Sequence, residues 1–219
     1  MAAISRSDVA RLALRLGVGC ILAAHGAQKL FGWFGGGGVT ATAGMLESMG
    51  FTPGRPSALA AGVSEAAGGT MLILGLATPS TGAATASTMA VAASAHGPKG
   101  LFSANGGYEF PALLGLASGA LALAGPGKIS VDHLLNYRLS NKPAALVSLF
   151  ATASATAVVL RRRHAVMAAA AEAEAAAEAT IAAEAAGDVA TARAAVEAVE
   201  RAELPKAEGE NAGLANDPG

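Results

Sequence analysis

The stretch SALAAGVSEAAGGTMLILGLA, residues Ser57–Ala77, contains 21 residues, of which only Glu65 is charged. A helix rises about 1.5 Å per residue, so about 20 apolar residues are enough to cross the hydrocarbon core of a bilayer. The stretch therefore predicts a membrane-spanning helix with one carboxylate inside it.

Four further apolar runs surround this stretch: Val9–Phe34 (interrupted by Arg11, Arg15, His25 and Lys29), Ser80–Ala95, Phe110–Gly125 and Ala144–Leu160. The mean hydropathy of the chain is +0.45 and only 14% of its residues are charged, whereas about a quarter are charged in a typical soluble domain. The pattern predicts an all-α membrane protein. We expect a four-helix transmembrane bundle with a fifth hydrophobic helix and an acidic Ala/Glu-rich C-terminal tail.

Two alternatives are less consistent with the sequence. A soluble alanine-rich bundle needs polar outer faces, and the apolar runs have almost none. A cleaved signal peptide would need a cleavage site after Leu16–Ala24, but the apolar segment continues to Phe34 without a convincing one. We therefore expect a retained first span.

The charges of the chain divide it into a basic body and an acidic tail. Residues 1–163 carry twelve Lys/Arg against five Asp/Glu, and residues 164–219 carry three against eleven. The expected domains are a four-helix membrane domain (1–143), a fifth membrane segment with a basic flank (144–163) and the tail (164–219). The tail is predicted to be a solvated, partly helical spacer that breaks at Gly187-Asp188 and has a disordered end after Pro205. The alternative is an acidic docking helix for a soluble partner.

The loops predict a topology. A tight turn at residues 77–80 makes an antiparallel hairpin of two spans, and the loops 35–56 and 97–109 lie on the opposite side. If the fifth run spans, each side receives six basic residues; if it lies in the surface, the count favours both termini inside by nine to three. We predict a multi-pass protein of the plasma (inner) membrane with a cytoplasmic N-terminus. The side that holds the tail stays open.

Polar groups inside or next to the spans indicate a candidate site, because such groups are costly in hydrocarbon and usually face the bundle interior. The candidate catalytic cluster consists of Glu65, Lys29, His25, His96 and Glu109. The simpler interpretation is that Lys29 snorkels, Glu109 caps a helix, and His25 and His96 are interfacial. No such simple interpretation applies to Glu65, because a carboxylate in the middle of an apolar run needs a partner. We therefore predict that it forms an ion pair or a charged hydrogen bond with Lys29.

The sequence lacks the motifs of several other kinds of functional site. Cys20 is the single cysteine, no metal-ligand spacing is present, and Gly35–Gly38 lacks the context of a phosphate-binding loop. We expect no metal and no nucleic-acid partner.

Four motifs resemble the DoxX family of small bacterial membrane proteins, and together they extend over about residues 6–135. They are GAQKLFGWFGG (26–36), EAAGGTMLILGLAT (65–78), GGYE (106–109) and GPGKISVD (125–132), with an arginine early in the first span. The resemblance implies a four-helix membrane bundle. It also implies a link to thiosulfate oxidation with quinone as acceptor and, in mycobacteria, to a complex with a superoxide dismutase and a thiosulfate sulfurtransferase.

Two functional hypotheses follow. The first is a DoxX-like subunit of a redox-linked membrane assembly, for quinone or sulfur/thiosulfate oxidation and oxidative-stress defence, which is not an autonomous enzyme. No cofactor is evident, and quinone is the candidate. The alternative is a non-catalytic scaffold that recruits soluble enzymes or assembles with a respiratory complex. A transporter is less favoured because no inverted repeat or broken helix is visible in the sequence.

Overall fold

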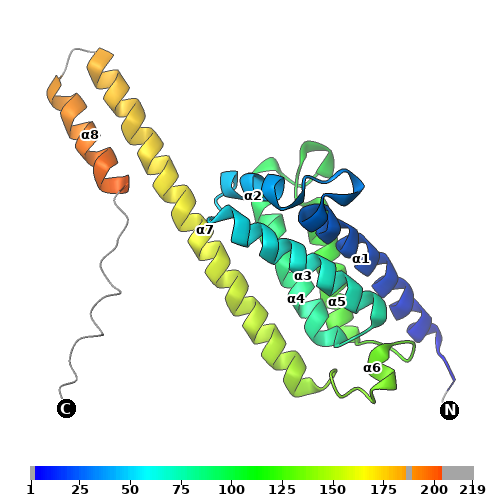
Figure 1. Ribbon diagram of the computed structural model, residues 1–219. Coiled ribbons are helices and arrows are strands. Elements are labelled where there is room, and N and C mark those ends of the chain that lie inside the picture. The colour runs from blue at the N-terminus through cyan, green and yellow to red at the C-terminus, as the bar shows by residue number, and fades with distance from the viewer. Residues whose placement is uncertain (1–2, 186–188, 204–219) are drawn as a thin grey trace, which may run out of the picture. The chain divides into compact units, whose positions relative to one another are not determined.

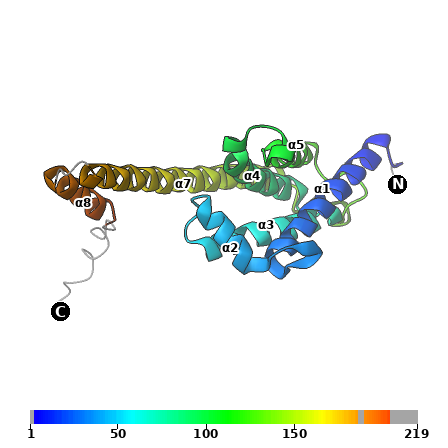
Figure 2. The same ribbon diagram turned by 90° about the horizontal axis from the view of Figure 1, so that it is seen from above.

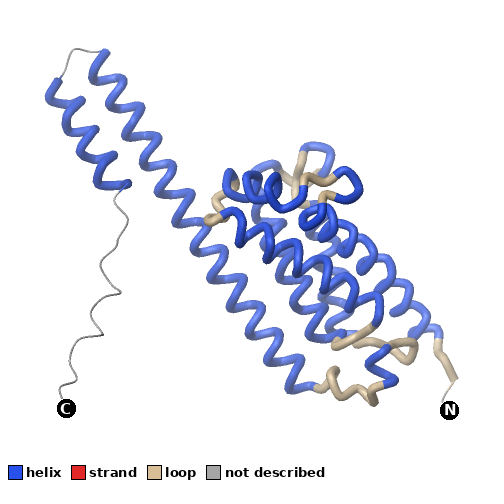
Figure 3. The backbone as a smooth tube through the Cα atoms, in the orientation of Figure 1, coloured by secondary structure: helices blue, strands red, loops and turns tan. Residues whose placement is uncertain are grey.

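The computed structural model describes residues 3–185 and 189–203, and within these ranges the chain is helical without a β-strand (Figure 1, Figure 3). The all-helical fold class is confirmed. The described part contains eight α-helices: α1 (Arg6–Phe31), α2 (Gly38–Ser48), α3 (Gly54–Leu74), α4 (Thr78–His96), α5 (Glu109–Ala124), α6 (Val131–Leu134), α7 (Lys142–Ala185) and α8 (Val189–Glu203). The chain divides into two compact units, residues 1–164 and 165–219.

The body of the first unit is built from α1, α3, α4 and α5. Helix α1 packs along α3, α4 packs along α5, and α3 contacts α4 (Figure 2). A compact apolar cluster fills the interior; its buried members are Val18, Leu22, Leu72, Met89, Leu114 and Leu121. Large side chains on the outer faces are exposed, among them Leu116, Leu123 and Phe150, as expected for helices that face lipid.

The contact between α1 and α3 depends on glycine at the crossing. A Cβ atom on Gly26 would lie 2.3 Å from the backbone nitrogen of Ala66, and a Cβ on Gly69 would lie 2.5 Å from that of Ala23. Neither position leaves room for a side chain. Small residues allow membrane helices to approach this closely, and the close approach brings the C-terminal part of α1 next to the middle of α3.

The predicted antiparallel hairpin at residues 77–80 is confirmed. Helix α3 ends at Leu74 because Gly75 takes a left-handed conformation with φ of 66°, and α4 starts at Thr78. The first helix ends at Phe31 rather than at Phe34, because Gly32 has φ of 73° and closes the helix. Its start is fixed by a capping box between Ser5 and Asp8.

The prediction of an irregular loop over residues 35–56 is wrong. Residues Gly38–Ser48 form α2, which packs against α3 and α1. The four glycines at 35–38 suggested a loop, but the first three precede the helix and Gly38 is its first residue. The residues that follow them are mostly good or moderate helix formers, and α2 is held by tertiary packing.

A boundary between the fifth apolar run and the tail at residues 163–164 is not visible in the secondary structure. A single helix, α7, extends from Lys142 to Ala185. No glycine or proline occurs between Ala144 and Ala186, and alanine, arginine and glutamate are strong helix formers. The change from apolar to acidic composition therefore alters the surroundings of the helix without ending it.

Three helices, α1, α3 and α7, are long and apolar enough to cross a membrane. Helix α5 is apolar but shorter, with 16 residues. Helix α4 has 19 residues, but it does not meet this criterion because four threonines and three serines lower its hydropathy. Several of these hydroxyls donate to carbonyls of their own helix, as Thr85 does to Thr81 at 2.9 Å.

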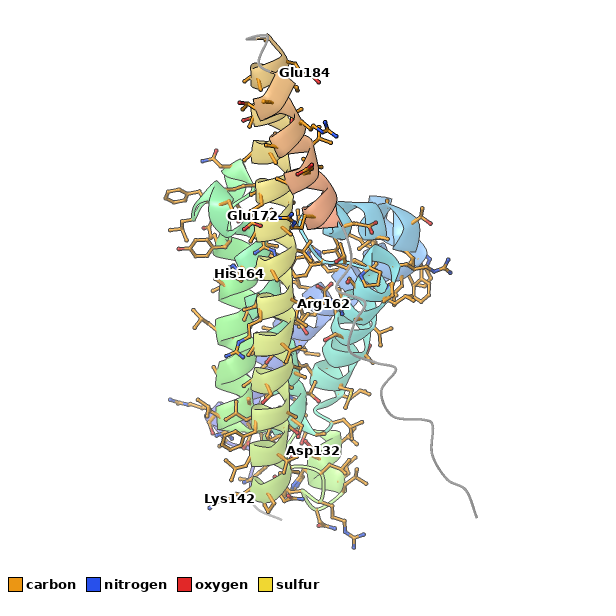
Figure 4. The ribbon with its side chains drawn as sticks, turned by 90° about the vertical axis from the view of Figure 1, so that its left-hand side faces the viewer. Asp132, Lys142, Arg162, His164, Glu172 and Glu184 are labelled. Carbon is orange, nitrogen blue, oxygen red and sulfur yellow. The ribbon has the colours of Figure 1, made fainter. Side chains whose placement is uncertain are left out.

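The second unit contains the C-terminal part of α7, from residue 165, and α8. The glutamates along this part of α7 are exposed: Glu172, Glu174, Glu178 and Glu184, of which Glu172 and Glu184 are labelled in Figure 4. This part of the tail is helical. The predicted break at Gly187-Asp188 and the predicted disorder after Pro205 lie outside the described residues.

Candidate functional site

The predicted contact between Lys29 and Glu65 is present. Lys29 lies in the last turn of α1 and Glu65 in the middle of α3. The Lys29 ammonium nitrogen donates to Oε2 of Glu65 at 2.5 Å. The carboxylate is almost completely buried, whereas one fifth of the Lys29 side chain is exposed. The pair exists because the glycine-lined crossing of α1 and α3 brings these two positions together.

The pair lies in the wall of a cavity of about 660 Å³. The cavity is bounded by α2 and the segment that follows it, by α3, by α4 and by the part of α7 that belongs to the first unit. Most of its lining is apolar, including Met45, Leu46, Phe51, Val91 and Val159. A volume in this range and a mostly apolar lining with few polar groups are typical of small-molecule sites.

Further polar groups of the cavity lie on α3 and α4. Ser64 on α3 and Thr88 on α4 share a hydrogen bond of 2.6 Å next to Glu65. His96, the last residue of α4, also lines the cavity, and its Nδ1 lies 2.8 Å from the Gly106 carbonyl oxygen. This contact fixes the ring, and Nε2 of His96 has no hydrogen-bond partner among the described residues.

Two of the five predicted site residues do not line this cavity. His25 is half-buried, and its ring packs against that of Phe110 of α5 in a tilted arrangement, with centroids 5.4 Å apart. Glu109 is exposed at the start of α5, where its carboxylate accepts a hydrogen bond from the Ser103 backbone nitrogen at 3.0 Å. The structure therefore brings Lys29, Glu65 and His96 together and leaves His25 and Glu109 outside the cavity. The chemical roles of all five remain predictions.

A second set of buried charges lies at the opposite end of the bundle, and none of its residues belongs to the cluster predicted from the sequence. Arg15 and Asp132 are completely buried, and Asp8 is 3% exposed. Asp132 accepts hydrogen bonds from the backbone nitrogens of Ala77 and Thr78 at 2.8 and 2.9 Å. It thereby caps α4, whose own N-cap residue, Ala77, has no side chain that can do so.

The same end is tied together by two more contacts. Arg15 donates from Nη2 to the Ile129 carbonyl, and Asp8 accepts from the Lys128 backbone nitrogen at 3.0 Å. The Nε and Nη1 atoms of Arg15 have no partner among the described residues. The available signal for Arg15 was its position six residues inside the apolar run that begins at Val9.

Within the described residues, no three His, Cys, Asp or Glu side chains lie close enough to hold a metal ion. Cys20 is exposed. The arrangement at the cavity can bind a polar head by a buried ion pair and an imidazole, and can place an apolar body beside them.

Comparison with known proteins gives one family match. The family model named DoxX matches residues 10–98, a range that contains most of α1 and all of α2, α3 and α4. Lys29, Glu65 and His96 all lie within it. Searches of curated proteins and of solved structures gave no match. Over residues 10–98, the chain is similar to the DoxX family of membrane proteins.

Proposed function

We propose that this chain is an integral membrane subunit of a redox-linked assembly and that its cavity receives the head of a quinone. In this proposal, residues 1–143 form a four-helix membrane bundle from α1, α3, α4 and α5, and residues 144–163 of α7 cross the plasma membrane as a fifth helix. Residues 164–219 form the tail. The protein acts with partners and is not an autonomous enzyme.

One observation carries the proposal. A buried Lys29–Glu65 pair and the His96 ring lie on one mostly apolar cavity of about 660 Å³. The head of a quinone has two carbonyl oxygens that accept hydrogen bonds, and it takes up protons when it is reduced. An ammonium group can donate such a bond. Because Nδ1 of His96 faces the Gly106 carbonyl oxygen, Nε2 can donate to the quinone only when the ring is protonated, and it can accept a proton when the ring is neutral.

The position of α7 supports a fifth crossing. Nε of Arg163 on α7 donates to the Met49 carbonyl oxygen at 2.8 Å, directly after α2. The opposite end of the first unit holds Lys128, whose side chain contacts the Ala3 carbonyl near the N-terminus. If α7 crosses, each side of the membrane carries six basic residues, so the distribution of basic residues does not favour either orientation. A cytoplasmic N-terminus is part of the proposal, but it does not rest on an excess of charge. The tail then starts on the side opposite the N-terminus.

The proposal is tested by quinone binding to the purified protein in lipid nanodiscs. A short-chain quinone should bind to the wild type, and K29M, E65Q and H96A should each weaken its binding. Removal of one good polar contact weakens binding by about tenfold. H25A and E109Q are matched controls because neither residue lines the cavity. Absence of binding to the wild type, or equal losses in the controls, would contradict the proposal.

The exposed glutamates of α7 support the second candidate, a scaffold. Soluble redox enzymes of the superoxide dismutase or sulfurtransferase type are the partners that we propose for it. A variant with Glu172, Glu174, Glu178 and Glu184 changed to glutamine keeps the helix-forming character but removes four charges. A scaffold should lose its co-purifying partners in this variant, whereas a quinone subunit should keep its quinone binding.

A further inference from the structure

The cavity has a second polar wall that the proposed redox role does not use. Arg162 and Arg163 on α7 line the cavity, whereas their neighbour Arg161 does not. Figure 4 shows Arg162 on the side of α7 that faces α3. These arginines follow directly after the apolar run Ala144–Leu160, so in a crossing helix they lie at the level of the lipid phosphates.

Arg163 is held in place by the neighbouring segment. Its Nε donates to the Met49 carbonyl oxygen at 2.8 Å, and its guanidinium carbon lies 5.3 Å from the ring centroid of buried Phe51. The two terminal nitrogens of Arg163 have no hydrogen-bond partner among the described residues, and the same holds for the whole guanidinium of Arg162. Two sets of N–H donors are therefore free at one edge of the cavity.

The charges of the lining favour an anion. Lys29, Arg162 and Arg163 are positive, and Glu65 is the only acidic residue in the lining. Because Glu65 is paired with Lys29, the surplus of positive charge lies on α7. Among the described residues, no carboxylate lies within ion-pair distance of Arg162 or Arg163.

The same wall continues as an apolar path toward the middle of the membrane. Below the arginines, α7 contributes Val159, Ala155 and Thr152 to the cavity lining. The ten residue-to-residue steps from Thr152 to Arg162 extend about 15 Å along the helix. A molecule with an anionic head at the arginines could place a hydrocarbon chain along this path.

We propose that the α7 edge of the cavity binds an acidic phospholipid, with its phosphate between Arg162 and Arg163 and an acyl chain along Val159 and Ala155. Guanidinium groups present planar sets of donors that match phosphate oxygens. Basic pockets between membrane helices bind anionic lipid head groups by this chemistry. The proposal goes beyond the redox role and does not depend on it, because the lipid contacts the α7 wall and not the Lys29–Glu65 pair.

The test is native mass spectrometry of the full-length protein released from nanodiscs that contain equal amounts of phosphatidylglycerol and phosphatidylcholine. The wild type should retain phosphatidylglycerol in preference to phosphatidylcholine. R162Q should lower the ratio of the two bound lipids about fivefold. R161Q removes the same charge from the same triplet, at a position outside the cavity, and should leave the ratio unchanged. An equal loss in R161Q, or no preference in the wild type, would overturn the proposal.

Two additions complete the test. Arg163 also contacts the Met49 carbonyl, so R163Q can destabilise the fold. R163K therefore serves as the second variant. It keeps the charge but loses the planar donors, and it should lower the ratio of the two bound lipids less than R162Q does.

In detergent without lipid, inorganic phosphate alone should not raise the melting temperature. A rise that depends on Arg162 and equals that given by phosphatidylglycerol would identify a free anion as the ligand and would overturn the lipid proposal.

Discussion

The two ends of the bundle use buried charge in different ways. At the end with Arg15 and Asp132, the carboxylate is completely buried and accepts three hydrogen bonds, from Ala77, Thr78 and the Ser140 hydroxyl. At the end with Lys29 and Glu65, the carboxylate has one partner, and the pair lies on a cavity. Charges whose partners are mostly backbone groups hold helices in register, whereas a pair on an open cavity can exchange its partner for a ligand. The comparison therefore separates a structural site from a candidate functional one.

The largest effect is expected for Asp132→Ala. The change leaves two backbone N–H groups and one hydroxyl without an acceptor, at about 1–3 kcal/mol for each buried donor. It also removes the negative charge that stabilises the buried Arg15 cation. We expect a loss of about 4–6 kcal/mol, measured as a lower free energy of unfolding in mixed micelles by circular dichroism.

Glu47→Ala is the control for this change, because Glu47 is exposed and makes no ion pair within the described residues. Its effect should stay within about 0.5 kcal/mol. If Asp132→Ala were as mild as Glu47→Ala, the structural role of the Arg15–Asp132 end would be wrong.

A smaller and asymmetric effect is expected at the Lys29–Glu65 end. Lys29→Met leaves a buried carboxylate without a partner, and removal of one member of a buried pair costs about 3–5 kcal/mol. Glu65→Gln should cost less, about 1–2 kcal/mol, because Lys29 is partly exposed and can extend its ammonium group toward water. The melting temperature of each variant in detergent measures the difference.

The double variant Lys29→Met/Glu65→Gln completes a thermodynamic cycle. Its loss of stability should be smaller than the sum of the two single losses, because no unpaired charge remains. Losses that simply add would show that the two residues are not coupled.

An effect smaller than that of Lys29→Met is expected where α1 crosses α3. Gly26→Ala places a methyl group against the Ala66 backbone and should destabilise the protein by about 1–3 kcal/mol. It should also weaken quinone binding, because it moves Lys29 away from Glu65. Gly17→Ala on the same helix is the matched control, since no atom lies within 4 Å of the added Cβ. An equal loss of stability in both variants would show that the close approach is not the cause.

Local patterns were sufficient to predict part of this molecule. The apolar run around Glu65, the turn at residues 77–80 and the contact between Lys29 and Glu65 followed from span length, turn residues and the cost of an unpaired carboxylate. The capping role of Asp132 did not follow, because its partners at Ala77 and Thr78 are more than 50 residues away in the sequence. Composition does not encode which helix end such a carboxylate reaches.

The error at residues 35–56 has a similar origin. Glycines at residues 35–38 suggested a loop, yet α2 starts at the last of them because packing against α3 stabilises it. The change in composition at residue 164 predicted a domain boundary, and α7 continues through it because helix propensity does not change there. His25 and Glu109 were grouped with the pair because of their depth along the spans, and depth alone does not determine which face of a helix a side chain occupies.

The difference between the two ends is tested most directly by photo-crosslinking of a quinone that carries a photoreactive group. The labelled protein is digested and its modified peptides are identified by mass spectrometry, with and without an excess of unlabelled quinone. The account predicts competed labels on peptides that contain cavity residues, such as Met45–Phe51 or Val91–His96, and none on the peptide that contains Gly125–Asp132. Labels that concentrate at the Arg15–Asp132 end, or that unlabelled quinone does not reduce, would contradict it.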